Sequence, residues 1–186
     1  MRLQGKQTIQ SVGGLDTRPT ASRVREAVFN IWQFEISGCR WLDLCAGTGA
    51  MGAEALCRGA AVVVGIEQAG RACAVIAKNW KKLARPDQQV QILQTDVLRG
   101  LGQLAGQQFE RIYFDPPYAC DFYDGVIEAI ATHHILSPNG VLAVEHHKFK
   151  RLPQTVGNLD AVQTRKYGTT ALTFYQTVDA SPLGSP

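Results

Sequence analysis

The sequence Asp115-Pro116-Pro117-Tyr118 contains the residue types that most directly suggest chemistry. It follows an apolar run, 111–114, with the composition of a buried strand. Two successive prolines fix φ and remove two backbone donors, so carbonyl oxygens in this turn remain able to accept hydrogen bonds. A carboxylate, a carbonyl and an aromatic ring in one rigid turn suit a planar base that presents an amino group. The motif therefore predicts transfer of a methyl group to a base nitrogen.

Each part of this motif has a candidate role. The amino nitrogen of guanine or adenine is a poor nucleophile because its lone pair is delocalised into the ring. Hydrogen bonds from its protons to Asp115 and to the Pro116 carbonyl would favour the reactive, pyramidal nitrogen and stabilise the developing charge. Tyr118 would stack on the base. The alternative is a rigid strand exit with a tyrosine in the core.

A glycine loop, 47–52, follows a second apolar run and precedes a helical pattern. Gly47, Gly49 and Gly52 would let the backbone pass close to a ligand, beside the free N–H groups of a helix start. NAD and FAD proteins share this spacing. Two acids favour S-adenosylmethionine: Asp43, in the preceding strand, could meet its ammonium group, and Glu67 could accept both ribose hydroxyls. Glu67 could equally cap a helix or end an exposed strand.

A third acid, Asp96, ends the next predicted strand. It could accept a hydrogen bond from an adenine amino group, or it could cap the short helix that follows. Three successive strands thus end in or beside an acid, which would bring the three acids to one edge of a sheet. Ligands of open α/β sheets bind at the carboxyl ends of the strands.

Apolar runs alternate with helical patterns along most of the chain, which indicates a parallel sheet covered on both faces. The predicted strands are 41–45, 62–66, 90–93, 112–114, 141–144, 161–167 and 170–178, and the predicted helices are 19–32, 50–58, 70–83, 98–104 and 122–130. The last two strands flank Gly168-Thr169 and read as a hairpin. We expect an α/β class I S-adenosylmethionine-dependent methyltransferase fold (Rossmann-like), with a mostly parallel seven-stranded sheet closed by an antiparallel hairpin. Residues 1–178 are expected to form one domain and 179–186 a frayed tail.

Composition narrows the class of protein. The longest apolar stretch, 60–66, is too short to span a bilayer, and no apolar segment follows the first basic residues. These features predict a cytoplasmic protein with no membrane partner. The five cysteines include no C-x-x-C pair, and the histidine pairs are adjacent in sequence, so no metal site is expected. Cys120 could be the nucleophile of a carbon-5 methyltransferase, but a half-buried thiol is the better interpretation.

Positive charge gathers at the two ends of the chain. Residues 1–30 hold five Lys or Arg and two acids, residues 145–186 hold five and three, and the middle holds nine and eleven. This distribution fits a polyanion held by the flanks, with a small molecule handled at the centre. Ordinary surface scatter is the alternative interpretation.

With these motifs in place, the chain resembles the RsmD family, which methylates the N2 amino group of a guanine in 16S ribosomal RNA. The resemblance runs from about residue 15 to 175 and rests on four segments: 18–30 (RPTASRVREAVFN), 52–60 (GAEALCRGA), 115–118 (DPPY) and 166–168 (KYG). It implies S-adenosylmethionine as cofactor. It also implies that 16S rRNA, within the small subunit or an assembly intermediate, is the partner, with Arg18, Arg23 and Arg25 placing RNA near the pocket. Family members usually open with a longer Arg- and Gly-rich segment than this chain has.

Other functions fit parts of the sequence. An adenine-N6 methyltransferase acting on DNA or RNA would use the same motif, and a glutamine side-chain methyltransferase typically has Asn in place of Asp115. An NAD-dependent oxidoreductase would explain the glycine loop but gives the 115–118 motif no role. An RNA-binding module without activity would explain the basic ends.

Overall fold

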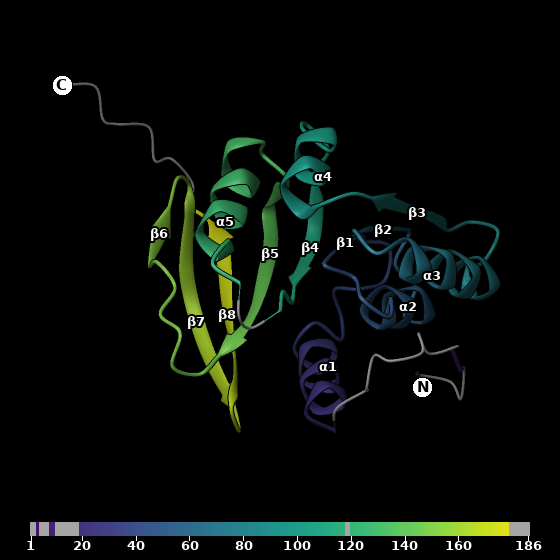
Figure 1. The fold of residues 1–186 in the computed structure, drawn as a ribbon, viewed down its shortest axis with the longest axis horizontal. Coiled ribbons are helices and arrows are strands. Elements are labelled where there is room, and N and C mark those ends of the chain that lie inside the picture. Colours follow the sequence, from purple (N-terminus) through teal and green to yellow (C-terminus); the bar gives the residue numbers. More distant parts are fainter. Residues whose placement is uncertain (1–2, 4–7, 10–18, 118–119, 179–186) are drawn as a thin grey trace.

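The computed structural model describes residues 3, 8–9, 19–117 and 120–178 and consists of one central sheet with helices on both faces (Figure 1). Its elements in chain order are α1 (Pro19–Ile31), β1 (Arg40–Leu44), α2 (Ala50–Cys57), β2 (Val62–Glu67), α3 (Gly70–Leu83), β3 (Gln89–Gln94), α4 (Val97–Gln103), β4 (Phe109–Phe114), α5 (Tyr123–Thr132), β5 (Leu136–His147), β6 (Thr155–Val156), β7 (Leu159–Tyr167) and β8 (Thr170–Thr177). The predicted tail, 179–186, lies outside the described residues.

The strand order confirms the expected fold class. Within the described residues the sheet has eight strands in the order β3-β2-β1-β4-β5-β8-β7-β6. Strands β1 to β5 pair in parallel, whereas β5–β8, β8–β7 and β7–β6 pair antiparallel. The prediction of seven strands was wrong by one. The additional strand, β6, contains only two residues, which is too short to give a periodic pattern.

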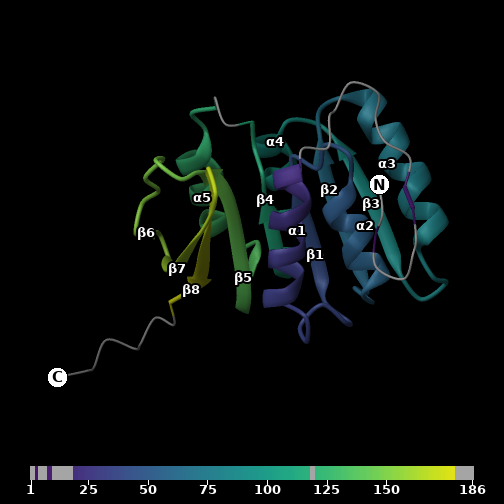
Figure 2. The same cartoon turned by 90° about the horizontal axis from the view of Figure 1, so that it is seen from below.

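Two apolar layers flank the sheet. Helices α1, α2 and α3 cover one face, and α4 and α5 cover the other, as Figures 1 and 2 show from two directions. Each face has its own cluster of buried side chains. Strand positions alternate between the two clusters: Trp41 and Val63 belong to the first, Leu42 and Val64 to the second. Strands that bury both faces read as continuous apolar runs, which is why the sequence indicates them clearly.

Helix α1 is fastened to the sheet by aromatic contacts. The Phe29 ring stacks on Trp41 at 5.1 Å between centroids, and Trp32 meets Trp41 edge-on at 5.5 Å. Arg58, directly after the neighbouring α2, lies over the Phe29 ring at 4.9 Å and pairs with Glu54. These contacts hold α1 against the core and thereby fix the position of its exposed Arg23.

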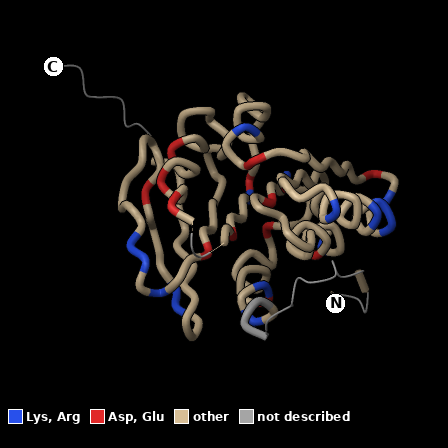
Figure 3. The backbone as a smooth tube through the Cα atoms, viewed as in Figure 1, with Lys and Arg blue, Asp and Glu red and all other residues tan. Residues whose placement is uncertain are grey.

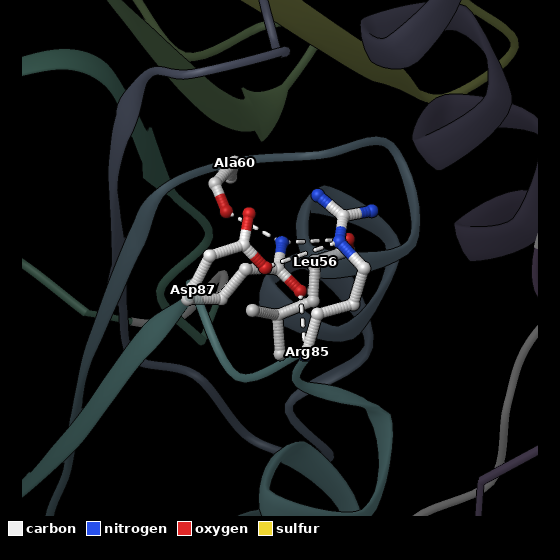
Figure 4. Close-up of polar contacts among 5 residues, drawn as sticks. Leu56, Ala60, Arg85 and Asp87 are labelled. Atoms are coloured by element: carbon white, nitrogen blue, oxygen red, sulfur yellow. Dashed lines mark hydrogen bonds and ion pairs between the residues drawn. The ribbon is translucent and has the colours of Figure 1, made fainter.

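The connection between α3 and β3 supplies hydrogen-bond donors to carbonyl groups at the C-terminal end of α2. The buried Gln88 amide donates to the carbonyls of Leu56 (3.0 Å) and Ala60 (2.6 Å), and its oxygen accepts from the Arg85 N–H at 2.9 Å. Figure 4 shows this corner, including the ion pair between Arg85 and Asp87. Carbonyls at a helix C-terminus have no partner inside the helix, so this side chain replaces water there.

Strand β5 is much longer than predicted. It spans Leu136–His147, although the prediction began at Val141 because Ser137-Pro138-Asn139-Gly140 has the composition of a turn. The pairing of β4 with β5 explains the difference. Phe109 pairs with Leu136 and Arg111 already pairs with Val141, so the intervening residues of β5 are absorbed in a bulge.

Candidate active site

Five acidic residues lie at or near the carboxyl ends of neighbouring strands. They are Asp43 (β1), Glu67 (β2), Asp96 (after β3), Asp115 (after β4) and Glu145 (β5). The register places the last residues of β1 and β4 side by side, because Leu44 pairs with Phe114, and Phe114 pairs with Val144 of β5, the residue before Glu145. The donor and acceptor motifs of the sequence therefore meet at one edge of the sheet.

The three glycines of the loop meet different surroundings. Gly47 has φ of 53° and open space around it: an added Cβ would meet only the Cys45 carbonyl oxygen, at 3.8 Å. A Cβ on Gly52 would instead lie 2.2 Å from the Trp80 ring, and one on Gly49 would lie 2.8 Å from Ile76. Gly49 and Gly52 are thus required by the packing of α3 against the loop, whereas Gly47 is the glycine open to a ligand.

Trp80 ties the glycine loop to α3. Its indole N–H donates to the Gly49 carbonyl at 2.8 Å, and the fully buried ring also fills the space above Gly65 of β2. The loop conformation is therefore fixed by a tryptophan 28 residues after Gly52 in the sequence. The glycine spacing alone gave no indication of this partner.

Asp43 is almost completely buried, with 2% exposure, and accepts a hydrogen bond from the Gly52 N–H at 3.0 Å. Burial raises the pKa of this carboxyl to about 8, the Gly52 amide works in the opposite direction, and the charge of Glu67 adds to the increase. A buried carboxyl with one amide donor and a raised pKa is suited to a cationic ligand, because the cation would restore the ionised form.

Glu67 ends β2 and is half-buried. It accepts from the Gly47 N–H and from the Ala69 N–H, both at 2.8 Å. The carboxylate therefore bridges the glycine loop and the start of α3. An ionised carboxylate has about four acceptor sites, so these two bonds leave capacity for further donors.

Asp96 adopts the capping geometry that was the alternative to ligand binding. It is the N-cap of α4: one oxygen accepts from the Arg99 N–H at 3.0 Å, and the other lies 3.3 Å from the Arg99 side chain. If Asp96 also contacts an adenine, its carboxylate would do so while bound to the N–H and the side chain of Arg99.

The acceptor motif follows β4 directly. Asp115 keeps contact with solvent at the strand end, and Pro116 is buried beneath it. The Pro117 carbonyl accepts from the Cys120 N–H at 2.9 Å, which closes the turn. Desolvation by surrounding protein raises the pKa of Asp115 well above its usual range, and the charges of Glu145 and Asp43 raise it further. Tyr118 lies outside the described residues.

Glu145 and Tyr113 also lie at this site, but the sequence analysis did not identify them as site residues. The Tyr113 hydroxyl donates to a Glu145 carboxylate oxygen inside the protein, and both side chains are buried. Burial, followed by the charges of Asp115 and Glu145, raises the pKa of Tyr113 well above 10, so the hydroxyl remains a donor. The available signal was Glu145 itself, which directly follows the apolar run 141–144. A charged residue that continues a buried strand needs a partner.

Cysteine chemistry does not fit this site. Cys45, beside the acids, has its pKa raised to about 12 by burial and by the charges of Glu67, Asp115 and Asp43. Burial also raises the pKa of Cys120, which is half-buried. A thiol held in its neutral form is a poor nucleophile, which disfavours carbon-5 methylation through either residue.

The arginines predicted to contact RNA lie on or before α1. Arg23 is exposed and Arg25 is half-buried, while Arg18 lies outside the described residues. Figure 3 shows basic positions on α1 and, separately, on the connection after β5 and on β7.

No group of His, Cys, Asp and Glu among the described residues could hold a metal ion. None of the described helices combines the length and apolarity that a bilayer crossing requires.

Comparisons with known proteins find similarity to methyltransferases over nearly the whole chain. The family model described as Conserved hypothetical protein 95 matches residues 3–176. The protein named "Putative rRNA methyltransferase YlbH" in Bacillus subtilis is 32% identical over 171 residues, covering 91% of this chain and 92% of its own. Ribosomal RNA small subunit methyltransferase D of Haemophilus influenzae is 30% identical over 160 residues, covering 86% and 82%. Among solved structures, "Putative methyltransferase yhhF from Escherichia coli" superposes with a TM-score of 0.81 at 26% identity, covering 95% and 97%.

Proposed function

Because the chain belongs to the RsmD family, we propose that it is an S-adenosylmethionine-dependent rRNA methyltransferase acting on the N2 amino group of a guanine in 16S rRNA. The observation that carries this proposal is the position of the Asp115-Pro116 turn. The turn lies beside the end of β1, whose continuation is the glycine loop, so an acceptor nitrogen held at Asp115 would be next to a donor held at Gly47.

The residues at the donor side fit S-adenosylmethionine. Gly47 leaves open space at the carboxyl edge, and Asp43 and Glu67 supply carboxylates for the ammonium group and the ribose hydroxyls. Asp96 would contribute at the adenine. The cofactor supplies a methyl group on a sulfonium, which makes the transfer an in-line displacement. The acidic edge around it suits a ligand that carries positive charge.

At the acceptor side, Asp115 would accept a hydrogen bond from the guanine amino group, and the Pro116 carbonyl would accept the second. Tyr118 would stack on the base. The nearby charges of Glu145 and Asp43 would help to stabilise positive charge developing on the nitrogen. Before the methyl group moves, the residues need only align the amino group and accept its hydrogen bonds, because no strong base is required. The surplus proton of the methylated nitrogen would then pass to Asp115 or to solvent.

The choice of guanine N2 in small-subunit RNA rests on the family and on relatives whose names specify the small subunit. The substrate would be 16S rRNA within the small ribosomal subunit or an assembly intermediate, which would place the reaction in the cytoplasm. Arg18, Arg23 and Arg25 would contact its phosphates.

The test is transfer of labelled methyl from S-adenosylmethionine to unmodified small subunits, to protein-free 16S rRNA and to duplex DNA, followed by nucleoside analysis. We expect N2-methylguanosine from the ribosomal material, and its loss in Asp115→Asn. The exposed neighbour Asp121→Asn is the matched control, which should retain transfer. Label in N6-methyladenine, or no label in any acceptor despite cofactor binding, would overturn the proposal.

A further inference from the structure

A single exposed aromatic ring stands in the basic turn after β5. Phe149 is 78% exposed and is flanked in sequence by Lys148, Lys150 and Arg151. Most large apolar side chains of this protein are buried, and Phe34 is the other phenylalanine among the described residues that is strongly exposed, at 89%. Phe34 follows α1, at the opposite edge of the sheet from the site. Phe149 therefore combines exposure, positive neighbours and proximity to the carboxyl edge.

The turn is held in place by the backbone. Pairing of β5 with β8 continues to His147 and Thr170, the Lys148 N–H then donates to the Thr169 carbonyl at 2.9 Å, and the Lys150 N–H donates to the His147 carbonyl at 2.8 Å. The His147 ring lies 5.3 Å from the Phe149 ring. These bonds present Phe149 on a fixed support, which lowers the entropy cost of stacking a ligand on it.

Lys150 connects this turn to the acceptor motif. Its ammonium group lies 5.0 Å from the centre of the Tyr123 ring, at the first residue of α5. Its charge also lowers the pKa of Cys120, three residues after Pro117, although burial outweighs this effect. The basic turn thus flanks the segment that carries Asp115-Pro116.

Further positive charge surrounds the turn. Arg165 and Lys166, near the end of β7, are exposed, and Figure 3 shows basic positions of β7 and of the connection after β5 close together. In Figures 1 and 2 the tip of the β7–β8 hairpin lies next to this connection. The acids of the site lie at the strand ends further inside. A polyanionic strand could follow the basic rim while one base enters the acidic pocket.

We propose that Phe149 is a stacking platform for an unpaired base next to the target nucleotide, with Lys148, Lys150 and Arg151 neutralising the flanking phosphates. This inference rests on the proposed function, because it assumes an RNA acceptor. Aromatic rings stack on bases of any sequence, and single-stranded RNA segments are bound in this way by proteins that splay bases out of a helix. The role adds a second contact region to the one expected on α1.

Binding of protein-free 16S rRNA to the full chain, measured by filter retention over a series of salt concentrations, tests the platform. Phe149→Ala should weaken RNA affinity about tenfold. Phe149→Trp should restore it, and Phe34→Ala should leave it unchanged. Lys148→Ala combined with Arg151→Ala should lower the salt dependence of binding by about two counterions. The affinity of Phe149→Ala for S-adenosylmethionine, measured separately, should equal that of the wild type.

Two outcomes would overturn the inference while the proposed function stands. In the first, Phe149→Ala binds protein-free rRNA as tightly as the wild type and methylates it with an unchanged KM. In the second, the variant loses affinity only for assembled small subunits, which would assign the ring to a protein contact. Failure of the proposed function is a separate result: wild-type protein would give no N2-methylguanosine even if its RNA binding depends on Phe149.

Discussion

The two halves of the site hold their acidic side chains in different ways. On the cofactor side, Asp43 and Glu67 accept hydrogen bonds from backbone amides of Gly52, Gly47 and Ala69. On the acceptor side, the structure places carboxyl groups close to one another, with Glu145 held by the Tyr113 hydroxyl and Asp115 affected by both Glu145 and Asp43. The proposed cofactor side is ordered by the main chain, whereas the proposed acceptor side concentrates carboxyl groups near the position proposed for the reacting nitrogen.

This difference predicts that changes on the two sides will affect cofactor binding and the transfer step separately. Backbone amides keep the donor carboxylates in place before any ligand arrives, so a change there should act mainly on cofactor affinity. Crowded carboxylates have raised pKa values and are relieved when positive charge approaches, so a change there should act mainly on the rate of transfer.

The largest expected effect is at Asp115. Replacing it with Asn removes the charge and one acceptor while keeping the shape, and we expect transfer to fall by roughly 10²–10³-fold or more. Asp115→Ala should abolish transfer. S-adenosylmethionine affinity, measured by calorimetry, should change little in both variants. Equal loss of affinity in Asp115→Ala and Glu67→Ala would contradict the separation of the two halves.

Glu67 should show the opposite behaviour. Glu67→Ala removes charge-assisted hydrogen bonds, so S-adenosylmethionine affinity should fall roughly tenfold to hundredfold. Turnover at saturating cofactor should remain close to that of the wild type. A variant with normal cofactor affinity and a low turnover number would show instead that Glu67 acts on the chemical step.

Gly52 tests whether packing orders the cofactor side. Gly52→Ala would place a Cβ 2.2 Å from the rigid Trp80 ring, and the free energy of unfolding should fall by about 1–3 kcal/mol or more. Urea unfolding measures this change. Gly102→Ala is the control, because nothing lies within 4 Å of its added Cβ and its φ is not positive. If the two variants are equally stable, packing against Trp80 does not explain the glycine.

The sequence predicted the parts of the molecule that depend on local pattern. Helix α3 was predicted with the bounds it has, 70–83, and α1, α2 and α4 within one residue at each end. Buried parallel strands and amphipathic helices have strong periodic signals, and Gly-rich turns mark their boundaries. Asp43 and Glu67, in β1 and β2, and Asp96 and Asp115, after β3 and β4, could be identified because each lies at or near the end of an apolar run.

The features that the sequence did not predict depend on contacts between residues far apart in the sequence. The hydrogen bond from Tyr113 to Glu145 crosses from β4 to β5, and Trp80 reaches back to the glycine loop. The bulge that extends β5 arises from its pairing with β4. The exposure of Phe149 is likewise set by how a turn is held between strands, so composition could not distinguish this ring from a core phenylalanine.

Glu145 gives a smaller, pH-dependent test of the acceptor side. Its charge raises the pKa of Asp115, so Glu145→Gln should lower that pKa. Only the ionised form of Asp115 supplies the negative charge that stabilises the developing positive charge on the nitrogen, so the acid limb of the pH–rate profile should move to lower pH. Glu128→Gln, at an exposed position on α5, should leave the profile unchanged. An unshifted acid limb in Glu145→Gln would show that the two carboxyl groups do not interact.

The smallest effect concerns the proton on Asp43. Its pKa of about 8 leaves this carboxyl mostly protonated at pH 7, whereas pairing with the ammonium group of a bound cofactor would favour ionisation. Binding should therefore release close to one proton at pH 7, and affinity should rise with pH up to about 8. Calorimetry in two buffers of different ionisation enthalpy counts the proton, and Asp43→Asn should release none. The folded-state pKa lies above the ordinary value, so the ligand-free protein should also lose stability as pH rises from about 4 to about 8. A pH-independent affinity would show that Asp43 is already ionised before binding, and the contrast in charge between the two halves would then be smaller than the structure indicates.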